Sequence, residues 1–154
     1  MPHIHDKVDF VADVFIVNKN KVLLRKHDKH NMWLSPGGHI ELDEDPNQAA
    51  IREVKEEVGL DISLIGKAKT YSNPRDGKDL IVPRFMNRHH VIDTHEHISM
   101  VYFAKTDSVD IKQGKTEISE EIRWFTKEEL DGPKFGISEK IRFYAKTALD
   151  ELGQ

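Results

Sequence analysis

Hydrophobic residues recur along the 154-residue chain with two periods, one typical of strands and one typical of helices. Near the N-terminus, residues 8–17 and 22–27 are rich in Val, Phe, Ile and Leu, and the polar residues 18–21 separate them. This arrangement predicts a β-hairpin with a tight turn. Further strands are expected at residues 60–65, 97–104 and 122–126.

Two other segments place their apolar residues at helical spacing. The first is predicted to be a helix from Pro46 to Val58, because Asp45 is a suitable N-cap. Gln48 completes a capping-box pattern with Asp45, and Gly59 suits the position after the last turn. The apolar face of this helix consists of Ala50, Ile51, Val54 and Val58.

The second helical segment closes the chain and has Ser138 as its expected cap. Its apolar stripe consists of Ile141, Tyr144, Ala145, Ala148 and Leu152. Before it, Thr126 is expected to cap a helical turn through Leu130. Residues 71–95 contain prolines and show little periodicity, which predicts a long excursion over the surface. Strands mixed with two substantial helices indicate an α/β architecture in which helices cover a sheet.

Composition narrows the class of protein. With 38% hydrophobic and 32% charged residues, the chain is predicted to form one globular domain over residues 1–154. A net charge of −4 argues against a general electrostatic surface for nucleic acid or an anionic membrane. The lack of cysteine excludes thiolate nucleophiles, cysteine-based zinc sites and disulfides. No apolar run approaches the roughly 18 residues of a membrane span, and we expect a cytoplasmic protein.

Three glutamates share one face of the first predicted helix. Glu53, Glu56 and Glu57 stand at positions i, i+3 and i+4, so their carboxylates project within an arc of about 100°. Like charges at this spacing raise each other's pKa and destabilise the helix unless a cation intervenes. An all-oxygen ligand set suits Mg²⁺ or Mn²⁺, which commonly bridge carboxylates to phosphates. Considered alone, three glutamates at this spacing are more typical of a solvated helix face than of a metal site.

A longer pattern surrounds these glutamates. Gly38 is followed after five residues by Glu44, and after seven more by residues 52–60, REVKEEVGL. Together they fill every specified position of the Nudix box, GX5EX7REUXEEXGU, in which U is a bulky aliphatic residue. A chance match in a chain of this length is on the order of one in ten million or rarer. The sequence therefore resembles the Nudix hydrolases.

The resemblance extends over most of the chain, because residues 33–38 look like the segment before the box and residues 121–125 look like a late family strand. It implies an α/β/α sandwich with a mixed central sheet flanked by helices. It also implies hydrolysis of a diphosphate linkage by water attack on phosphorus, with Mg²⁺ or Mn²⁺ as cofactor. The implied substrate is a small nucleoside diphosphate linked to another moiety: ADP-ribose, a dinucleoside polyphosphate, a nucleotide sugar or a nucleoside triphosphate.

The resemblance also assigns roles to the residues of the box. Glu53, Glu56 and Glu57 would bind the metal, with the carbonyl of Gly37 as a further ligand. Family members differ in the position of the catalytic base, which leaves Glu53 and Glu96 as the two candidates in this sequence. We expect the base to be one of these two carboxylates.

Two further roles concern residues around the ligands. Arg52 and Glu44 match the family pair that braces the loop against the helix, and such a pair orients metal ligands. Arg25, on the second predicted strand, is a candidate for binding the substrate's phosphates through its fork of donors.

Other residues leave alternatives open. The segment 84–97 is rich in histidine and arginine and is either a contact for the variable part of the substrate or an ordinary surface. The aromatic residues Trp33, Phe103 and Trp124 are expected in the core. Pro74 lies near the position of a proline in relatives that cleave ADP-ribose. RNA 5′ ends are the nucleic-acid alternative to a small substrate, and a homodimer is compatible with these motifs.

Two other functions are alternatives to hydrolysis. A nucleotide-sensing module without turnover shares the fold, but a sensor can lose the carboxylates that this chain retains. Isopentenyl diphosphate isomerase also shares the fold and relies on a catalytic cysteine, which this sequence lacks.

Overall fold

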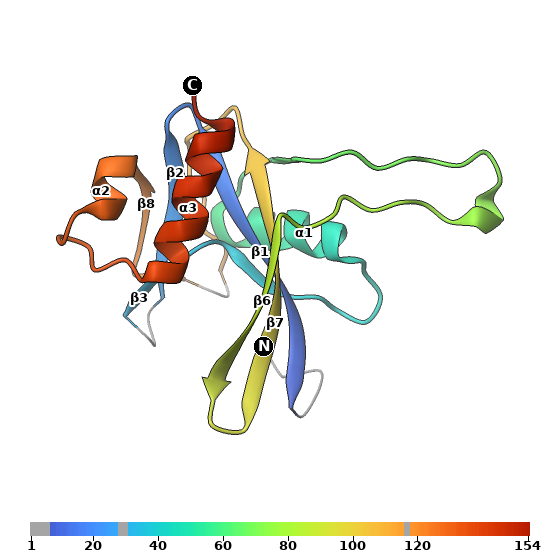
Figure 1. Cartoon of the computed structure of the whole chain (residues 1–154), viewed down its shortest axis with the longest axis horizontal. Coiled ribbons are helices and arrows are strands. Elements are labelled where there is room, and N and C mark those ends of the chain that lie inside the picture. Colours follow the sequence, from blue (N-terminus) through green and yellow to red (C-terminus); the bar gives the residue numbers. More distant parts are fainter. Residues whose placement is uncertain (1–6, 28–30, 116–117) are drawn as a thin grey trace.

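The computed structural model describes residues 7–27, 31–115 and 118–154 (Figure 1). Within these residues, eight strands form one mixed sheet, with a central order of β3-β2-β1-β7-β5. The additional strands β4, β6 and β8 pair with β1, β7 and β2, respectively. The β1–β7 pair is parallel and the other pairs are antiparallel.

The strands are β1 (Val8–Asn18), β2 (Lys21–His27), β3 (Met32–Leu34), β4 (Gly37–His39), β5 (Ser63–Leu64), β6 (Phe85–Ile92), β7 (His95–Lys105) and β8 (Glu121–Phe125). The helices are α1 (Pro46–Val58), α2 (Lys127–Asp131), α3 (Glu139–Leu152) and the short 3-10 helix η1 (Pro74–Asp76).

The sheet separates two apolar cores, one under each long helix. Along β1, Val14 and Ile16 pack in the core that contains the buried residues of α1. The alternate residues Phe15 and Val17 pack in the core that contains those of α3. Successive side chains of a strand point to opposite faces, so α1 and α3 cover opposite faces of the sheet, as Figure 1 shows. The predicted α/β fold with helices flanking a mixed sheet is confirmed.

Local sequence signals predicted both long helices correctly. Asp45 and Gln48 form a reciprocal capping box at the start of α1, and the helix ends at Val58, before Gly59 with φ 72°. Ser138 accepts a hydrogen bond from the backbone N–H of Ile141 at the start of α3. No helix in the described ranges combines the length and apolar character needed to cross a membrane.

The predicted surface excursion over residues 71–95 is wrong in its second half. There, β6 forms an antiparallel hairpin with β7, which begins at His95 and not at residue 97. Along β6, half-buried and exposed residues alternate, but polar side chains such as Asn87 and His89 occupy the inner face. Because polar residues occupy part of the inner face, the sequence of β6 does not alternate between apolar and polar residues as a half-buried strand usually does.

The arm that remains, residues 66–84, projects away from the sheet and carries η1 near its tip (Figure 1). Most of its residues up to residue 79 are exposed. The strand predicted at residues 60–65 forms only over Ser63–Leu64. Trp33 and Phe103 are buried as predicted, whereas Trp124 is only partly buried against the core on the α1 side.

Candidate active site

The three glutamates of α1 differ in their exposure. Glu53 and Glu57 are each 2% exposed and lie on the side of the helix that faces the sheet. The side chain of Glu56 is 56% exposed. Burial of a carboxylate is costly unless hydrogen bonds and positive charges compensate it. The surroundings of Glu53 and Glu57 therefore decide what this face of α1 can do.

Two glycines of β4 form the cradle for these carboxylates. The backbone N–H of Gly37 donates a hydrogen bond of 2.7 Å to Glu57 Oε1. Gly38 pairs with Ala12 of β1, on the α1 side of the sheet. A Cβ at Gly38 would lie 2.4 Å from the carboxyl carbon of Glu53, so a larger residue at this position would displace the Glu53 carboxylate or β4.

An arginine on β2 compensates the charge of the buried Glu57. Arg25 is 7% exposed, and its Nε lies 2.6 Å from Glu57 Oε2. Its Nη1 donates a hydrogen bond of 2.7 Å to Ser119 Oγ. The structure therefore places this predicted phosphate-binding residue in an ion pair with a predicted metal ligand. Arg25 also lines the adjacent cavity.

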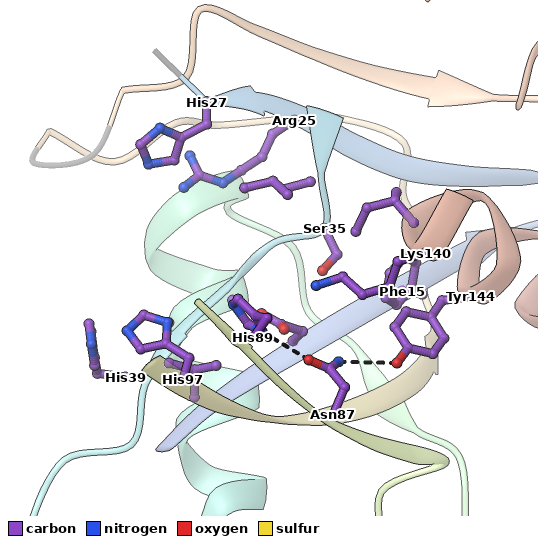
Figure 2. A pocket seen from close by; sticks show the side chains of 16 residues that line it. Phe15, Arg25, His27, Ser35, His39, Asn87, His89, His97, Lys140 and Tyr144 are labelled. Carbon is purple, nitrogen blue, oxygen red and sulfur yellow. Dashed lines mark hydrogen bonds between the residues drawn. The ribbon is translucent and has the colours of Figure 1, made fainter. Parts of the chain in front are cut away.

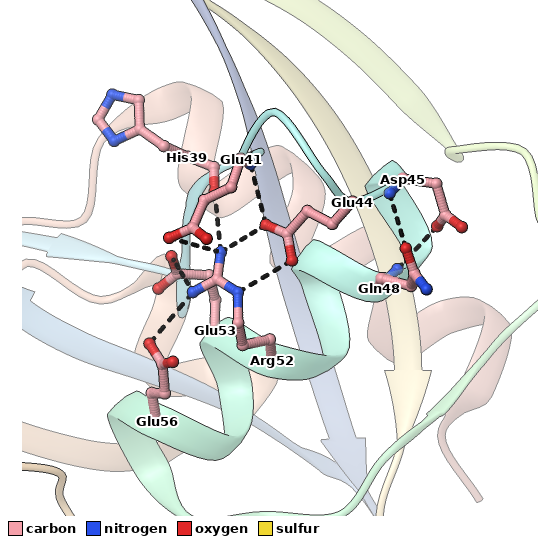
Figure 3. Close-up of polar contacts among 8 residues, drawn as sticks. All are labelled: His39, Glu41, Glu44, Asp45, Gln48, Arg52, Glu53 and Glu56. Atoms are coloured by element: carbon pink, nitrogen blue, oxygen red, sulfur yellow. Dashed lines mark hydrogen bonds and ion pairs between the residues drawn. The ribbon is translucent and has the colours of Figure 1, made fainter. Parts of the chain in front are cut away.

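A second arginine joins α1 to the loop that precedes it (Figure 3). Arg52 donates two hydrogen bonds to Glu44, of 3.0 Å from Nε and 2.6 Å from Nη2. Its Nη1 lies 3.0 Å from Glu53 Oε1 and 3.1 Å from Glu56 Oε2. Nη2 also donates to the carbonyl of His39 at 3.1 Å. The hydrogen bond from Arg52 lowers the pKa of Glu44, which therefore stays ionised.

Replacing this fork with a single ammonium group should destabilise the protein. We expect Arg52→Lys to lower the free energy of unfolding by about 1–3 kcal/mol, because lysine cannot form the paired hydrogen bonds to Glu44. Urea unfolding measures this change. Arg75→Lys, on the exposed arm, is the matched control and should unfold like the parent. Equal stabilities of Arg52→Lys and the parent would contradict a bracing role.

A cavity of about 220 Å³ opens on the α3 side of the sheet (Figure 2). Nitrogen-bearing side chains dominate its polar lining: Arg25, His27, His39, Asn87, His89, His97 and Lys140. Gly37 and Gly38 also line it, so the strand that contacts the buried glutamates forms part of the wall. This lining suits an anionic group with hydrogen-bond acceptors.

Asp13 and Lys140 are cavity residues that sequence reasoning missed. Burial raises the pKa of Asp13, although a hydrogen bond with Ser99 and the charge of Lys140 oppose the increase. Desolvation lowers the pKa of Lys140, and Asp13 opposes that decrease. A signal for Asp13 exists in the sequence, because it alternates with Val11 and Phe15 within a run of mostly apolar residues.

Of the basic residues predicted in the 84–97 segment, His89 and His97 line the cavity. His89 Nδ1 lies 2.9 Å from Asn87 Oδ1. Burial lowers the pKa of His89 to about 4, and the charge of Lys140 contributes. Arg84 instead forms an exposed ion pair of 2.7 Å with Glu151. His89 is therefore neutral in the folded protein at pH 7.

This neutral histidine should make the protein acid-sensitive. Because its pKa falls from 6.5 to about 4 on folding, the stability that it contributes is lost as pH falls from 6.5 towards 4. Linkage gives about 2 kcal/mol between pH 7 and pH 5, or about 1 kcal/mol after discounting for partial exposure. Urea unfolding at both pH values should therefore show a loss about 1 kcal/mol smaller in His89→Asn than in the parent. Identical losses would contradict the expected shift.

The structure places Glu96 on the β6–β7 hairpin, where Arg88 binds it. Arg88 Nη2 lies 2.7 Å from Glu96 Oε1, and Nε donates to Oε2 at 3.1 Å. This bond lowers the pKa of Glu96, and a lower pKa makes a carboxylate a weaker base. Among the described residues, the cavity lining contains Gly38 but neither Glu53 nor Glu96. Only Glu53, of the two candidate bases, contacts Arg52 and lies against Gly38.

Comparison with known proteins identifies the fold and the family. A NUDIX hydrolase of known structure from Clostridium perfringens is 38% identical, with a TM-score of 0.83 over 94% of this chain and 97% of that chain. The CTP pyrophosphohydrolase of Escherichia coli (strain K12) is 25% identical over 70% of this chain and 84% of that protein. An RNA pyrophosphohydrolase of Marinomonas sp. (strain MWYL1) is 34% identical over 51% of this chain.

The match with the Marinomonas protein spans 47% of that relative's length, so it covers less than half of the relative. The model of the NUDIX domain matches residues 9–147 of this chain, which include the sheet, α1 and most of α3. The chain therefore belongs to the NUDIX family.

Proposed function

We propose that this protein is a metal-dependent hydrolase that cleaves a diphosphate linkage in a nucleoside diphosphate derivative. One observation carries the proposal: α1 buries the carboxylates of Glu53 and Glu57 against β4, and the same strand lines a cavity rich in nitrogen donors. Carboxylates that hold a cation and donors that hold phosphate oxygens are the two parts that diphosphate cleavage needs.

The residues of α1 fit a hard divalent cation. Their donor atoms are carboxylate oxygens, and two of the three carboxylates are buried within one helical turn. We propose that Glu53, Glu56 and Glu57 hold Mg²⁺ or Mn²⁺, with the carbonyl of Gly37 as a further ligand. The bound ion would supply charge neutralisation for the diphosphate and lower the pKa of a bound water.

The protein's own groups orient this chemistry. Arg52 holds Glu53 and Glu56 from the side of the loop, and Arg25 and the Gly37 N–H hold Glu57. These contacts fix the ligands before substrate binds, which reduces the reorganisation needed in the transition state.

We propose Glu53 as the group that takes the proton from the attacking water. Its burial on α1, one turn from Glu56 and Glu57 and against Gly38, supports this choice over Glu96, which lies on the β6–β7 hairpin. The nitrogen-rich lining of the cavity would bind phosphate oxygens, with Arg25 as one donor and Lys140 as another.

The relatives support a nucleotide substrate. The names of two of them give CTP and RNA as the molecules on which they act. The cavity of about 220 Å³ can accept only part of a small nucleotide derivative. The β6–β7 hairpin, which contributes Asn87, His89 and His97 to the cavity wall, is placed to contact the rest.

A product assay tests the proposal. ADP-ribose, dinucleoside polyphosphates, nucleotide sugars, nucleoside triphosphates and triphosphorylated RNA are each incubated with the protein and Mg²⁺ or Mn²⁺. We expect the parent to release a phosphate-containing product from at least one substrate, and Glu56→Gln to release it at least about a hundredfold more slowly. Labelled water then identifies the phosphorus that is attacked.

Two outcomes would overturn the hydrolase proposal. One is the absence of product from every substrate, and the other is equal activity of Glu56→Gln and the parent. Tight nucleotide binding without turnover would instead favour the sensing module.

A further inference from the structure

A second group of candidate metal ligands lies on the α3 side of the sheet, near the cavity. Asp9 on β1 is the register partner of His97 on β7, so the two side chains point to the same face. His95 is two residues before His97 and shares that face. His39 of β4 is the register partner of Val11, two residues after Asp9. The pairing of three strands thus gathers one carboxylate and three imidazoles.

The distances from Asp9 to its neighbouring imidazoles suit a single ion. His95 Nε2 lies 3.2 Å, and His39 Nε2 3.4 Å, from Asp9 Oδ2. With metal–ligand bonds of about 2.0–2.1 Å, a tetrahedral site separates neighbouring ligand atoms by about 3.3 Å. The ligand atoms of Asp9, His95 and His97 all lie within 4.8 Å of one another.

The imidazole ring of His97 lies next to those of His39 and His95. The ring centroid of His97 lies 5.0 Å from that of His39 and 5.2 Å from that of His95, edge to face in both pairs. Figure 2 shows His39 and His97 side by side at one end of the cavity. This arrangement brings ring nitrogens from β4 and β7 to one carboxylate of β1.

The number of imidazoles exceeds what the charge of Asp9 requires. Asp9 is 1% exposed, and one imidazolium would neutralise its carboxylate. Gathering further rings at a buried position costs desolvation and side-chain entropy. A cation with several ligands accounts for the extra rings, because each ring then contributes one bond to it.

We propose that Asp9, His39, His95 and His97 form a binding site for one Zn²⁺-type transition metal ion, separate from the carboxylates of α1. Imidazole nitrogens suit Zn²⁺ and its neighbours in the first transition row, whereas Mg²⁺ prefers oxygen ligands. A bound ion joins β1, β4 and β7 and so stabilises the folded protein. It also fixes the strand that presents Gly37 and Gly38 to the glutamates.

Zn²⁺ binding by the whole chain tests this proposal. The protein is stripped of metal with a chelator and titrated with Zn²⁺ by calorimetry in excess Mg²⁺, which occupies the α1 carboxylates. We expect one Zn²⁺ per chain and, at about a hundredfold excess over Kd, a thermal unfolding midpoint higher by about 5 °C or more. Glu56→Gln should bind Zn²⁺ as the parent does, so failure of the proposed hydrolase activity leaves this result unaffected.

Matched variants locate the site. His97→Ala and Asp9→Asn should weaken Zn²⁺ binding about tenfold or more and abolish the rise in the unfolding midpoint. His90→Ala is the control, because His90 is exposed on the other face of the same hairpin. Unchanged binding in His97→Ala, an equal loss in His90→Ala, or no stoichiometric binding by the parent would overturn the proposal.

A spectroscopic measurement keeps the proposal testable if a variant fails to fold. Co²⁺ replaces Zn²⁺ in the parent, again in excess Mg²⁺, and its visible absorption reports the coordination geometry. Strong bands of a four-coordinate ion are expected. The weak spectrum of a six-coordinate, water-rich ion would contradict the proposed set of ligands.

Discussion

Glu57→Gln is expected to reduce turnover by about a hundred- to a thousandfold, a loss of about 3–4 kcal/mol of transition-state stabilisation. Glutamine keeps the size of the side chain and can still accept the hydrogen bond from the Gly37 N–H. It loses the negative charge that pairs with Arg25 and that would hold the cation. Initial rates on the substrate identified in the product assay measure this effect.

A control variant shows whether the loss of any glutamate would lower the rate. Glu128→Gln, on the exposed side of α2, is the matched control and should retain the parent rate. Parent-like turnover by Glu57→Gln would remove this carboxylate from the catalytic machinery.

Gly38→Ala is expected to affect both stability and turnover. The new Cβ would lie 2.4 Å from the carboxyl carbon of Glu53, so either β4 or the Glu53 side chain must move. Overpacking of this kind costs about 1–3 kcal/mol of unfolding free energy. A displacement of about 1 Å in a reacting group can also cost about a hundredfold in rate. Urea unfolding and initial rates provide the two measurements.

A second glycine offers the control. The atom nearest to a Cβ at Gly132 would be the carbonyl oxygen of Glu128, at 3.5 Å, which is an ordinary contact. Gly132→Ala should therefore match the parent in rate and lose little stability. If Gly38→Ala behaved in the same way, the close packing of β4 against Glu53 would not matter for function.

The elements that sequence reasoning predicted best are those specified by local chemistry. The limits of α1 follow from Asp45, Gln48 and Gly59, each of which acts on backbone groups within one turn. The shared face of the glutamates follows from the helical period alone. The family of the chain, and the expected role of these glutamates as metal ligands, follow from the Nudix box.

Long-range pairing could not be predicted in the same way. The contact between Arg25 and Glu57 depends on how β2 lies against α1, and no local pattern specifies that. The inner face of β6 was missed because Asn87 and His89 line a cavity and do not fill an apolar core. At this strand, the requirement for a polar site removed the hydrophobic alternation on which strand prediction depends.

Two aspartates within the apolar run of β1 are a sequence signal from which buried polar contacts on this strand could have been predicted. Asp9 and Asp13 occupy the same face of β1 as Phe15, which packs in the core beside α3. Buried carboxylates on such a face need partners from other strands. In the structure, Asp9 meets His39 and His95.

The central claim is that the α1 carboxylates hold the divalent cation required for hydrolysis. The most direct test is the initial rate of product release by chelator-treated protein as Mg²⁺ or Mn²⁺ is added back, for the parent and for Glu56→Gln. We predict no release without the ion, a saturable rise in the parent, and a rate at least about a hundredfold lower in the variant. Parent-like release by the metal-free protein, or the same metal response in Glu56→Gln, would contradict the claim.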